Sequence, residues 1–269
     1  MQQYNKLPSF ILKSNARVHL TQNLGTGIGA FLLHILCLMP VVYITSIIEA
    51  TALNKVVLIF IANVVVDIVS SILTAGENYI ALCMSASQGC GVMDMFKSVK
   101  DNLLKIVGIR IIPAVVKTCA YIPFMLAYRN FQDLAQSYDM DLLMTSYVAG
   151  DVDKVMEMLE PVIPMEMMLL GYGILYLIVS EAIVIMFSQT LFILHDYQDK
   201  TAKDIIVDGL KIMKGQVGRY FYIQCSFILW DLMTFLTCGL STIWVYPYKR
   251  VTYSELYLDI MRGYNGTRN

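Results

Sequence analysis

Charged residues are scarce in this chain, and their scarcity decides its class. Only 15% of the 269 residues are Asp, Glu, Lys or Arg, whereas soluble domains carry about 25%. Hydrophobic residues make up 57%, and the mean hydropathy is +0.59. Several apolar runs reach the length of roughly 20 residues that a membrane helix needs, and none alternates as barrel strands do. The sequence therefore predicts an all-α, polytopic membrane helix bundle.

Catalytic and metal-binding motifs are also missing. The sequence has no HExxH, no GxSxG, no Walker-type GxxxxGK[ST] and no Rossmann glycine pattern after a strand. Its six cysteines include no CxxC pair, and its three histidines are widely dispersed. We therefore expect no catalytic residues, no metal ion and no cofactor, and we interpret the cysteines as small buried hydrophobes.

The order of apolar and polar stretches predicts a single membrane domain over residues 1–269. Its segments are a cytoplasmic N-terminal helix (1–26), a helical hairpin (27–76), a cytoplasmic amphipathic segment (77–105), a helical pair (106–194) with an acidic outer loop (129–162), a second cytoplasmic amphipathic segment (195–219), a further helical pair (220–248) and a cytoplasmic tail (249–269). The last apolar stretch, Leu240–Tyr248, is short.

The distribution of basic residues favours six crossings with both termini in the cytoplasm. Cytoplasmic loops collect Lys and Arg, and this topology places 15 of the 20 basic residues on the cytoplasmic side. Five crossings would move the four basic residues near the C-terminus to the outside. Both numbers of crossings stay open, and we prefer six.

Five ionisable residues fall inside the predicted spans: His34, Asp67, Lys117, Glu181 and Asp231. Such groups cost about 2.5–3.5 kcal/mol each at the centre of a membrane helix, so they usually face the bundle interior. Lys117 is expected to pair with Asp67 or Glu181, which should lie at comparable depth. The five residues are either a polar path for an ion, proton or small solute, or fixed pairs that hold helices together.

The second half of the chain carries a recognisable series of short motifs. Residues 193–196 are Ile-Leu-His-Asp and residues 213–215 are Met-Lys-Gly. Residues 226–230, Ser-Phe-Ile-Leu-Trp, precede Leu-Thr-Cys-Gly at 236–239 and Trp-Val-Tyr-Pro-Tyr at 244–248. This order and spacing resembles an uncharacterised, mostly Firmicutes family of membrane proteins, called domain of unknown function nine-seven-five.

The resemblance is clear over residues 187–257 and weaker over 76–106 and the N-terminal helix. It implies an integral protein of the bacterial cytoplasmic membrane without an established substrate, cofactor or catalytic residue. Two departures stand out. Val179-Ser180 replaces a Pro-Gly pair in the fourth span, which puts a kink there in doubt, and the acidic region 129–160 resembles an insertion.

The motif residues have structural interpretations. They are Asp196, Lys214, Gly215, Trp230, Gly239, Pro247 and Tyr248. Gly215 suits a helix C-cap, Gly239 marks a break, and Trp230 should pack against a neighbouring helix. Tyr248 belongs to an aromatic and basic anchor at the membrane interface.

These observations favour a non-enzymatic accessory or scaffold component of the bacterial cytoplasmic membrane. The alternative is a small-solute or ion transporter that uses the intramembrane charges, and a weaker one is a lipid-processing enzyme with polar groups beside His195 and Asp196. The expected partners are the lipid bilayer and anionic lipid headgroups at the cytoplasmic face. Protein partners are not predicted, and nucleic acid is not expected.

Overall fold

The computed structural model describes residues 6–51, 55–137 and 140–266, and every regular element in these ranges is an α-helix. In chain order the helices are α1 (Ser9–Gln22), α2 (Leu24–Thr51), α3 (Val56–Ser85), α4 (Asp94–Ser137), α5 (Met140–Val148), α6 (Val152–Leu159), α7 (Val162–Phe187), α8 (Thr190–Asp196), α9 (Ala202–Met213), α10 (Val217–Cys225), α11 (Ile228–Leu236) and α12 (Thr242–Gly266). They form two compact units, Met1–Ala114 with Val184–Asn269, and Val115–Ile183.

The predicted helical class is confirmed, and the predicted number of crossings is supported only in part. Within the described ranges, three segments are long and apolar enough to cross a membrane: Leu24–Thr51, Val56–Ser85 and Val152–Asp196. Their most apolar windows have mean hydropathies of 2.3, 2.6 and 2.1. Large apolar side chains on them face outwards, as at Leu36 and Leu170, which are 69% and 66% exposed. Such surfaces are costly in water and suited to lipid.

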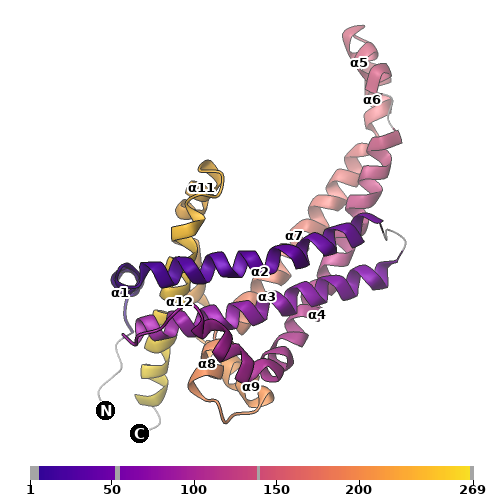
Figure 1. Cartoon of the computed structure of the whole chain (residues 1–269). Coiled ribbons are helices and arrows are strands. Elements are labelled where there is room, and N and C mark those ends of the chain that lie inside the picture. Colours follow the sequence, from indigo (N-terminus) through magenta and orange to yellow (C-terminus); the bar gives the residue numbers. More distant parts are fainter. Residues whose placement is uncertain (1–5, 52–54, 138–139, 267–269) are drawn as a thin grey trace. The chain divides into compact units, whose positions relative to one another are not determined.

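The first unit is built on α2 and α3, which lie side by side (Figure 1). Near Thr51, where α2 ends, the Asn63 amide donates a hydrogen bond to Glu49 Oε1 at 2.7 Å. At the opposite end of α3, a Cβ added to Gly76 would lie 2.3 Å from Met95 Cγ and 2.8 Å from the Met95 carbonyl oxygen. Glycine therefore allows α3 to approach the first turn of α4 closely.

Helix α12 packs against α1, α2 and α3, and it continues through Pro247 to Gly266 (Figure 1). The cytoplasmic tail predicted from residue 249 is therefore helical in the described part, and most of residues 251–261 are buried. Two of its carboxylates lie beside basic side chains, since Arg219 lies 2.5 Å from Asp259 and His19 lies 3.5 Å from Glu255. The location of this helix in the cytoplasm stays a prediction.

Three predicted boundaries differ from those in the structure. Helix α3 continues to Ser85, nine residues beyond the predicted end of the first hairpin at residue 76. The amphipathic segment ending at residue 105 and the apolar span after it form one continuous helix, α4. By contrast, the predicted span 220–236 is divided between α10 and α11, which are nine residues each. Nine helical residues extend only about 13.5 Å, less than half of a bilayer core of about 30 Å.

Helix α11 and the start of α12 form a hairpin, residues 228–245, which we call the apolar hairpin. Its turn contains the predicted break, where Cys238 and Gly239 have φ angles of +49° and +89°. The polar side chains near the turn bond within the hairpin. Thr237 Oγ1 donates to the Met233 carbonyl at 2.8 Å, and Ser241 Oγ donates to Thr234 Oγ1 at 3.0 Å.

The second unit contains parts of α4 and α7 with α5 and α6. The α4 and α7 parts pack through aromatic rings, since the Tyr121 and Tyr176 centroids lie 5.5 Å apart and Gly173 leaves room for Phe124. Helix α7 runs without interruption through Val179-Ser180. The acidic region contains the end of α4 together with α5 and α6.

Candidate functional site

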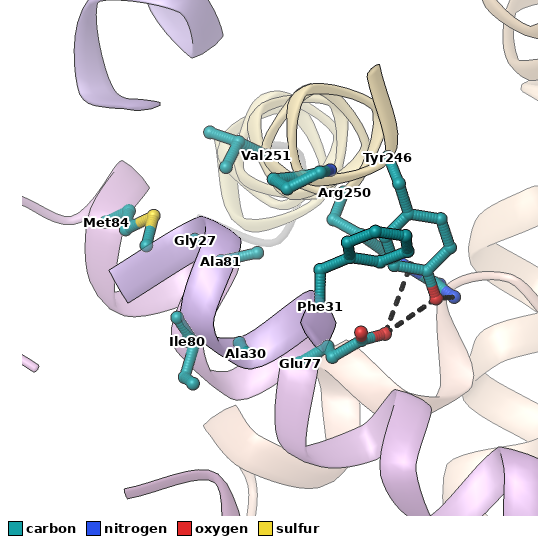
Figure 2. A pocket seen from close by; sticks show the side chains of 11 residues that line it. Gly27, Ala30, Phe31, Glu77, Ile80, Ala81, Met84, Tyr246, Arg250 and Val251 are labelled. Carbon is teal, nitrogen blue, oxygen red and sulfur yellow. Dashed lines mark hydrogen bonds and ion pairs between the residues drawn. The ribbon is translucent and has the colours of Figure 1, made fainter. Parts of the chain in front are cut away.

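Helices α2, α3 and α12 meet around a small cavity (Figure 2). A Cβ added to Gly27 would lie 2.8 Å from Leu20 Cδ1 and 3.4 Å from Pro247 Cβ, so Gly27 lies at a close contact with both residues. The cavity contains about 260 Å³ of space free of protein atoms. Its lining residues are Gly27, Ala30, Phe31, Glu77, Ile80, Ala81, Met84, Tyr246, Pro247, Arg250 and Val251.

Glu77 is the centre of the polar side of this cavity. It is only 4% exposed. The Tyr246 hydroxyl donates a hydrogen bond to Glu77 Oε2 at 2.8 Å, and Arg250 Nε lies 3.5 Å from the same oxygen, as Figure 2 shows. A buried carboxylate needs such partners, because removing it from water costs several kcal/mol.

Arg250 completes a closed arrangement between α3 and α12. Its Nη2 donates to the Tyr246 hydroxyl at 2.6 Å and to Thr74 Oγ1 at 3.4 Å. The guanidinium also lies 4.8 Å from the centroid of the Tyr246 ring. We call Glu77, Tyr246, Arg250, Thr74 and His34 the Glu77 network. It links the second half of α3 to the second and third turns of α12 and to α2.

His34 brings α2 into this network. Its Nδ1 lies 3.0 Å from Glu77 Oε1, but the two atoms are not aligned for a hydrogen bond, and neither has another hydrogen-bond partner in the described ranges. The imidazole is 7% exposed and packs edge-on to the Tyr246 ring at 6.1 Å. The pair therefore places two polar atoms that lack hydrogen-bond partners among the described residues at the contact between α2 and α3.

One of the predicted intramembrane residues takes part in this network. His34 belongs to the Glu77 network, whereas Asp67 lies ten positions before Glu77 on α3, about 15 Å along the helix axis. Lys117 and Glu181 lie in the second unit. The pairing of Lys117 with Asp67 or Glu181 stays a prediction.

Asp231 has a partner that the sequence analysis did not predict. Its Oδ1 lies 2.5 Å from Lys249 Nζ, with side chains 53% and 24% exposed respectively. The pair joins the first turn of α11 to α12 at the base of the apolar hairpin. We interpret it as a fixed contact of that hairpin.

Glu77 and Arg250 were missed because the sequence analysis placed them outside the membrane helices. Glu77 was assigned to a cytoplasmic segment and Arg250 to the tail. A usable signal does follow Glu77, because Ile80, Ala81 and Met84 continue the apolar helical spacing of α3. The burial of Arg250 has no comparable signal in the sequence.

The Ile-Leu-His-Asp motif has structural contacts. His195 Nε2 lies 2.8 Å from the Ala75 carbonyl oxygen, and His195 Nδ1 lies 3.1 Å from Ser98 Oγ. Because a carbonyl only accepts, Nε2 carries the proton and Nδ1 accepts from Ser98. Asp196 Oδ2 accepts from the Tyr257 hydroxyl at 2.5 Å. His195 thus connects α8 to α3 and α4, and Asp196 connects it to α12.

The other motif residues lie at turns and packing contacts. Lys214 is the C-cap of α9, and Gly215, the residue after it, has a φ of +84°. A positive φ is common at this position where a helix ends, and it favours glycine. The Trp230 and Tyr248 rings meet edge-on at 6.4 Å, and the Tyr248 hydroxyl donates to the Lys13 carbonyl at 3.2 Å.

Comparisons with known proteins agree with the motif series. No curated protein and no solved structure matches the chain. The family described as "Protein of unknown function (DUF975)" matches residues 8–263, nearly the whole chain, which confirms the resemblance found in the sequence. The chain therefore belongs to the DUF975 family of proteins of unknown function.

Proposed function

We propose that this chain is an integral protein of the bacterial cytoplasmic membrane that acts as a non-catalytic accessory or scaffold component of a membrane complex. Both termini lie in the cytoplasm in this proposal. The apolar surfaces of Leu24–Thr51, Val56–Ser85 and Val152–Asp196 support insertion. The cytoplasmic position of the termini is supported by the basic residues, because it places 15 of the 20 on the cytoplasmic side.

The topology that we propose has four crossings and one hairpin of partial depth. Helices α2 and α3, the apolar part of α4 and helix α7 make the crossings. The apolar hairpin enters the bilayer and returns, since α11 has only nine residues. The prediction with six crossings also places both termini in the cytoplasm. The two arrangements agree on this point, because a last pair of crossing helices and a hairpin that enters and leaves the bilayer on one side both return the chain to the cytoplasm.

The observation that carries the scaffold proposal is the engagement of buried polar groups in contacts between helices. Glu77 and Arg250 join α3 to α12, and His195 joins α8 to α3 and α4. A catalytic or transport group must exchange partners during turnover, whereas these groups are held by packed neighbours. In particular, the groups that a lipid-processing enzyme would use, His195 and Asp196, already bind Ala75, Ser98 and Tyr257.

Two measurements test the scaffold proposal. The full chain is purified from its native membrane in mild detergent after cross-linking, and the bound proteins are identified and quantified. It is also reconstituted into liposomes for proton and potassium flux. We expect a partner in fixed stoichiometry and flux equal to that of protein-free liposomes. Flux well above that level, abolished by Glu77→Gln, would contradict the proposal.

Transport remains a second candidate because of one specific observation. His34 Nδ1 and Glu77 Oε1 are close but not hydrogen bonded, and Glu77 borders a cavity. A proton pathway would use this pair together with Asp67, Lys117 and Glu181. Its test is a pH-sensitive dye inside liposomes, with Glu77→Gln, Asp67→Asn and Glu181→Gln compared with the unaltered chain. Equal dye responses in all four would eliminate this candidate.

The predicted Asp67–Lys117 pair has its own test. Asp67→Asn and Lys117→Gln are made singly and together. If the residues are partners, the double variant is more stable than the sum of the two single effects predicts. Additive losses would show that they do not interact.

A further inference from the structure

The joint between α10 and α11 places two ammonium groups on one aromatic ring. Lys13 of α1 donates to the Ser226 carbonyl at 3.1 Å, and its Nζ lies 4.2 Å from the centroid of the Phe227 ring. Lys249 Nζ lies 5.6 Å from the same centroid. Phe227 is fully buried, so these cations surround a rigid apolar support.

A third cation lies one turn further along α1. The Arg17 guanidinium is 5.9 Å from the centroid of Tyr248, whose ring meets that of Phe227 edge-on at 5.2 Å. Arg17 is exposed. Lys13, Arg17 and Lys249 therefore form a basic group at the base of the apolar hairpin, and we call it the basic cluster.

The positive charge of the basic cluster is only partly neutralised. Asp231 forms an ion pair with Lys249 at 2.5 Å. Over residues 6–51, 55–137 and 140–266, neither Lys13 nor Arg17 forms an ion pair with a carboxylate. Burial, together with the charge of Arg17, lowers the pKa of Lys13, as expected for a cation that lacks an anionic partner. Lys13 uses one of its three donors on Ser226, which leaves two for a ligand.

The surface next to the basic cluster is strongly apolar. Leu229, Phe235 and Leu240 on the apolar hairpin are 75%, 81% and 72% exposed. Trp230 lies between this surface and Tyr248. Cations and aromatic rings at the base of an apolar segment match the arrangement of a phospholipid, with its phosphate at the interface and its acyl chains in the hydrocarbon.

We propose that Lys13, Arg17 and Lys249 bind the phosphate of an anionic phospholipid whose acyl chains lie along α11. This inference depends on insertion of the apolar hairpin into a membrane, but it does not depend on the scaffold role. Phosphatidylserine and phosphatidylglycerol share the phosphate that the basic cluster would bind. The carboxylate of the first and the hydroxyl groups of the second can add contacts to it. Phosphatidylcholine has the same phosphate, but its own choline cation balances the charge, so we expect it to bind the basic cluster more weakly than phosphatidylglycerol.

The test measures thermal stability of the full chain in neutral detergent as phosphatidylglycerol, phosphatidylcholine or inorganic phosphate is added. The variant is Lys13→Gln with Arg17→Gln, and the matched control is Lys203→Gln with Lys211→Gln, which removes the same charge from exposed positions of α9. We expect phosphatidylglycerol to stabilise the unaltered chain and the control. The Lys13/Arg17 variant should bind it about 30-fold more weakly, since each basic residue near an anionic lipid surface contributes about 1 kcal/mol.

Several outcomes would overturn the proposal. Equal phosphatidylglycerol affinity in the Lys13/Arg17 variant and the control excludes the site, and equal stabilisation by inorganic phosphate excludes the lipid assignment. If the double variant does not fold, Arg17→Gln alone is measured, because Arg17 is exposed; an unchanged affinity there also excludes the site. Flotation with vesicles of phosphatidylcholine alone tests membrane insertion separately, so a chain that inserts but shows no preference for anionic lipid fails only this inference.

Discussion

The apolar hairpin and the second half of α12 are neighbours in the chain, but their composition and burial are opposite. In α11, Leu229, Phe235 and Leu236 are apolar and 66–81% exposed, and none of its nine residues is buried. In α12, the polar residues Thr252, Ser254 and Asp259 are at most 1% exposed. The more polar segment is therefore the buried one.

The exposure of apolar residues in α11 and the burial of polar residues in α12 bear on what surrounds each segment. A soluble protein buries its apolar residues, because its whole surface is in contact with water. Here Asp259 pairs with Arg219, and the Thr252 hydroxyl donates to the Tyr248 carbonyl at 2.8 Å, so these two groups have partners away from water. The apolar groups of α11 gain nothing from contact with water, and their exposure supports the proposal that the apolar hairpin enters the bilayer.

The largest effect should come from shortening a buried side chain in α12. Leu256 is fully buried, so Leu256→Ala should lower the free energy of unfolding by about 2–5 kcal/mol. Leu236 on α11 is 66% exposed, and Leu236→Ala should change it by less than about 0.5 kcal/mol. Unfolding in mixed micelles gives both values. Equal losses would abolish the contrast between the two segments.

A smaller effect is expected where α3 approaches α4. Gly76→Ala would place Cβ 2.3 Å from Met95 Cγ and 2.8 Å from the Met95 carbonyl oxygen, so the backbone must shift, at a cost of about 1–3 kcal/mol. Gly25→Ala is the matched control, because nothing lies within 4 Å of its added Cβ. Thermal unfolding should separate the two variants. A stable Gly76→Ala variant would mean that this helix contact is loose.

The contact between α8 and α12 should contribute about 1.5–3 kcal/mol, as hydrogen bonds to charged groups do. Tyr257→Phe removes the donor to Asp196 and leaves the ring, which stacks on Phe192 with centroids 5.3 Å apart. The loss is measured by unfolding in detergent at neutral pH. A variant as stable as the unaltered chain would show that Asp196 finds another donor.

The same tyrosine predicts a dependence on pH. Burial, and then the hydrogen bond to Asp196, raises the pKa of Tyr257 above its ordinary value, which is about 10. Because the folded state holds this proton more tightly, the stabilisation is complete below pH about 10 and is lost as the pH rises above it. The unaltered chain should therefore lose more stability than Tyr257→Phe in this alkaline range. Parallel profiles would contradict the assignment.

The smallest effect is expected for the pair at the base of the apolar hairpin. Asp231 and Lys249 are both partly exposed, and such pairs contribute about 0–1 kcal/mol. Asp231→Asn should therefore leave unfolding in detergent nearly unchanged. A loss well above 1 kcal/mol would indicate that another molecule covers the pair.

The sequence predicted what local patterns determine. Long apolar runs predicted the two helices of the first hairpin and the start of the second helix, but α3 continues to Ser85, nine residues beyond the predicted end at residue 76. Gly215 and Gly239 have the positive φ angles of a C-cap and a break. Composition alone also identified His34 as a polar residue that must face other helices, and it is buried beside Glu77.

The sequence could not predict what depends on distant partners. The second half of α12 has the polar composition of a tail, and it is buried by contacts with elements distant in the chain, including α1, α3, α8 and α10. Glu77 and Arg250 acquire their role because α3 and α12 meet, which no local pattern reports. The break between α10 and α11 was missed for a similar reason, since the apolar pattern continues across Ser226 and Phe227.

The depth of Cys238, at the tip of the apolar hairpin, tests the central claim most directly. A spin label is attached there after the other five cysteines are replaced by alanine: Cys37, Cys83, Cys90, Cys119 and Cys225. In bilayers, we predict that the label collides readily with oxygen and rarely with a water-soluble nickel complex, as a group in hydrocarbon does. Frequent collision with the nickel complex would place the tip in water and contradict the account.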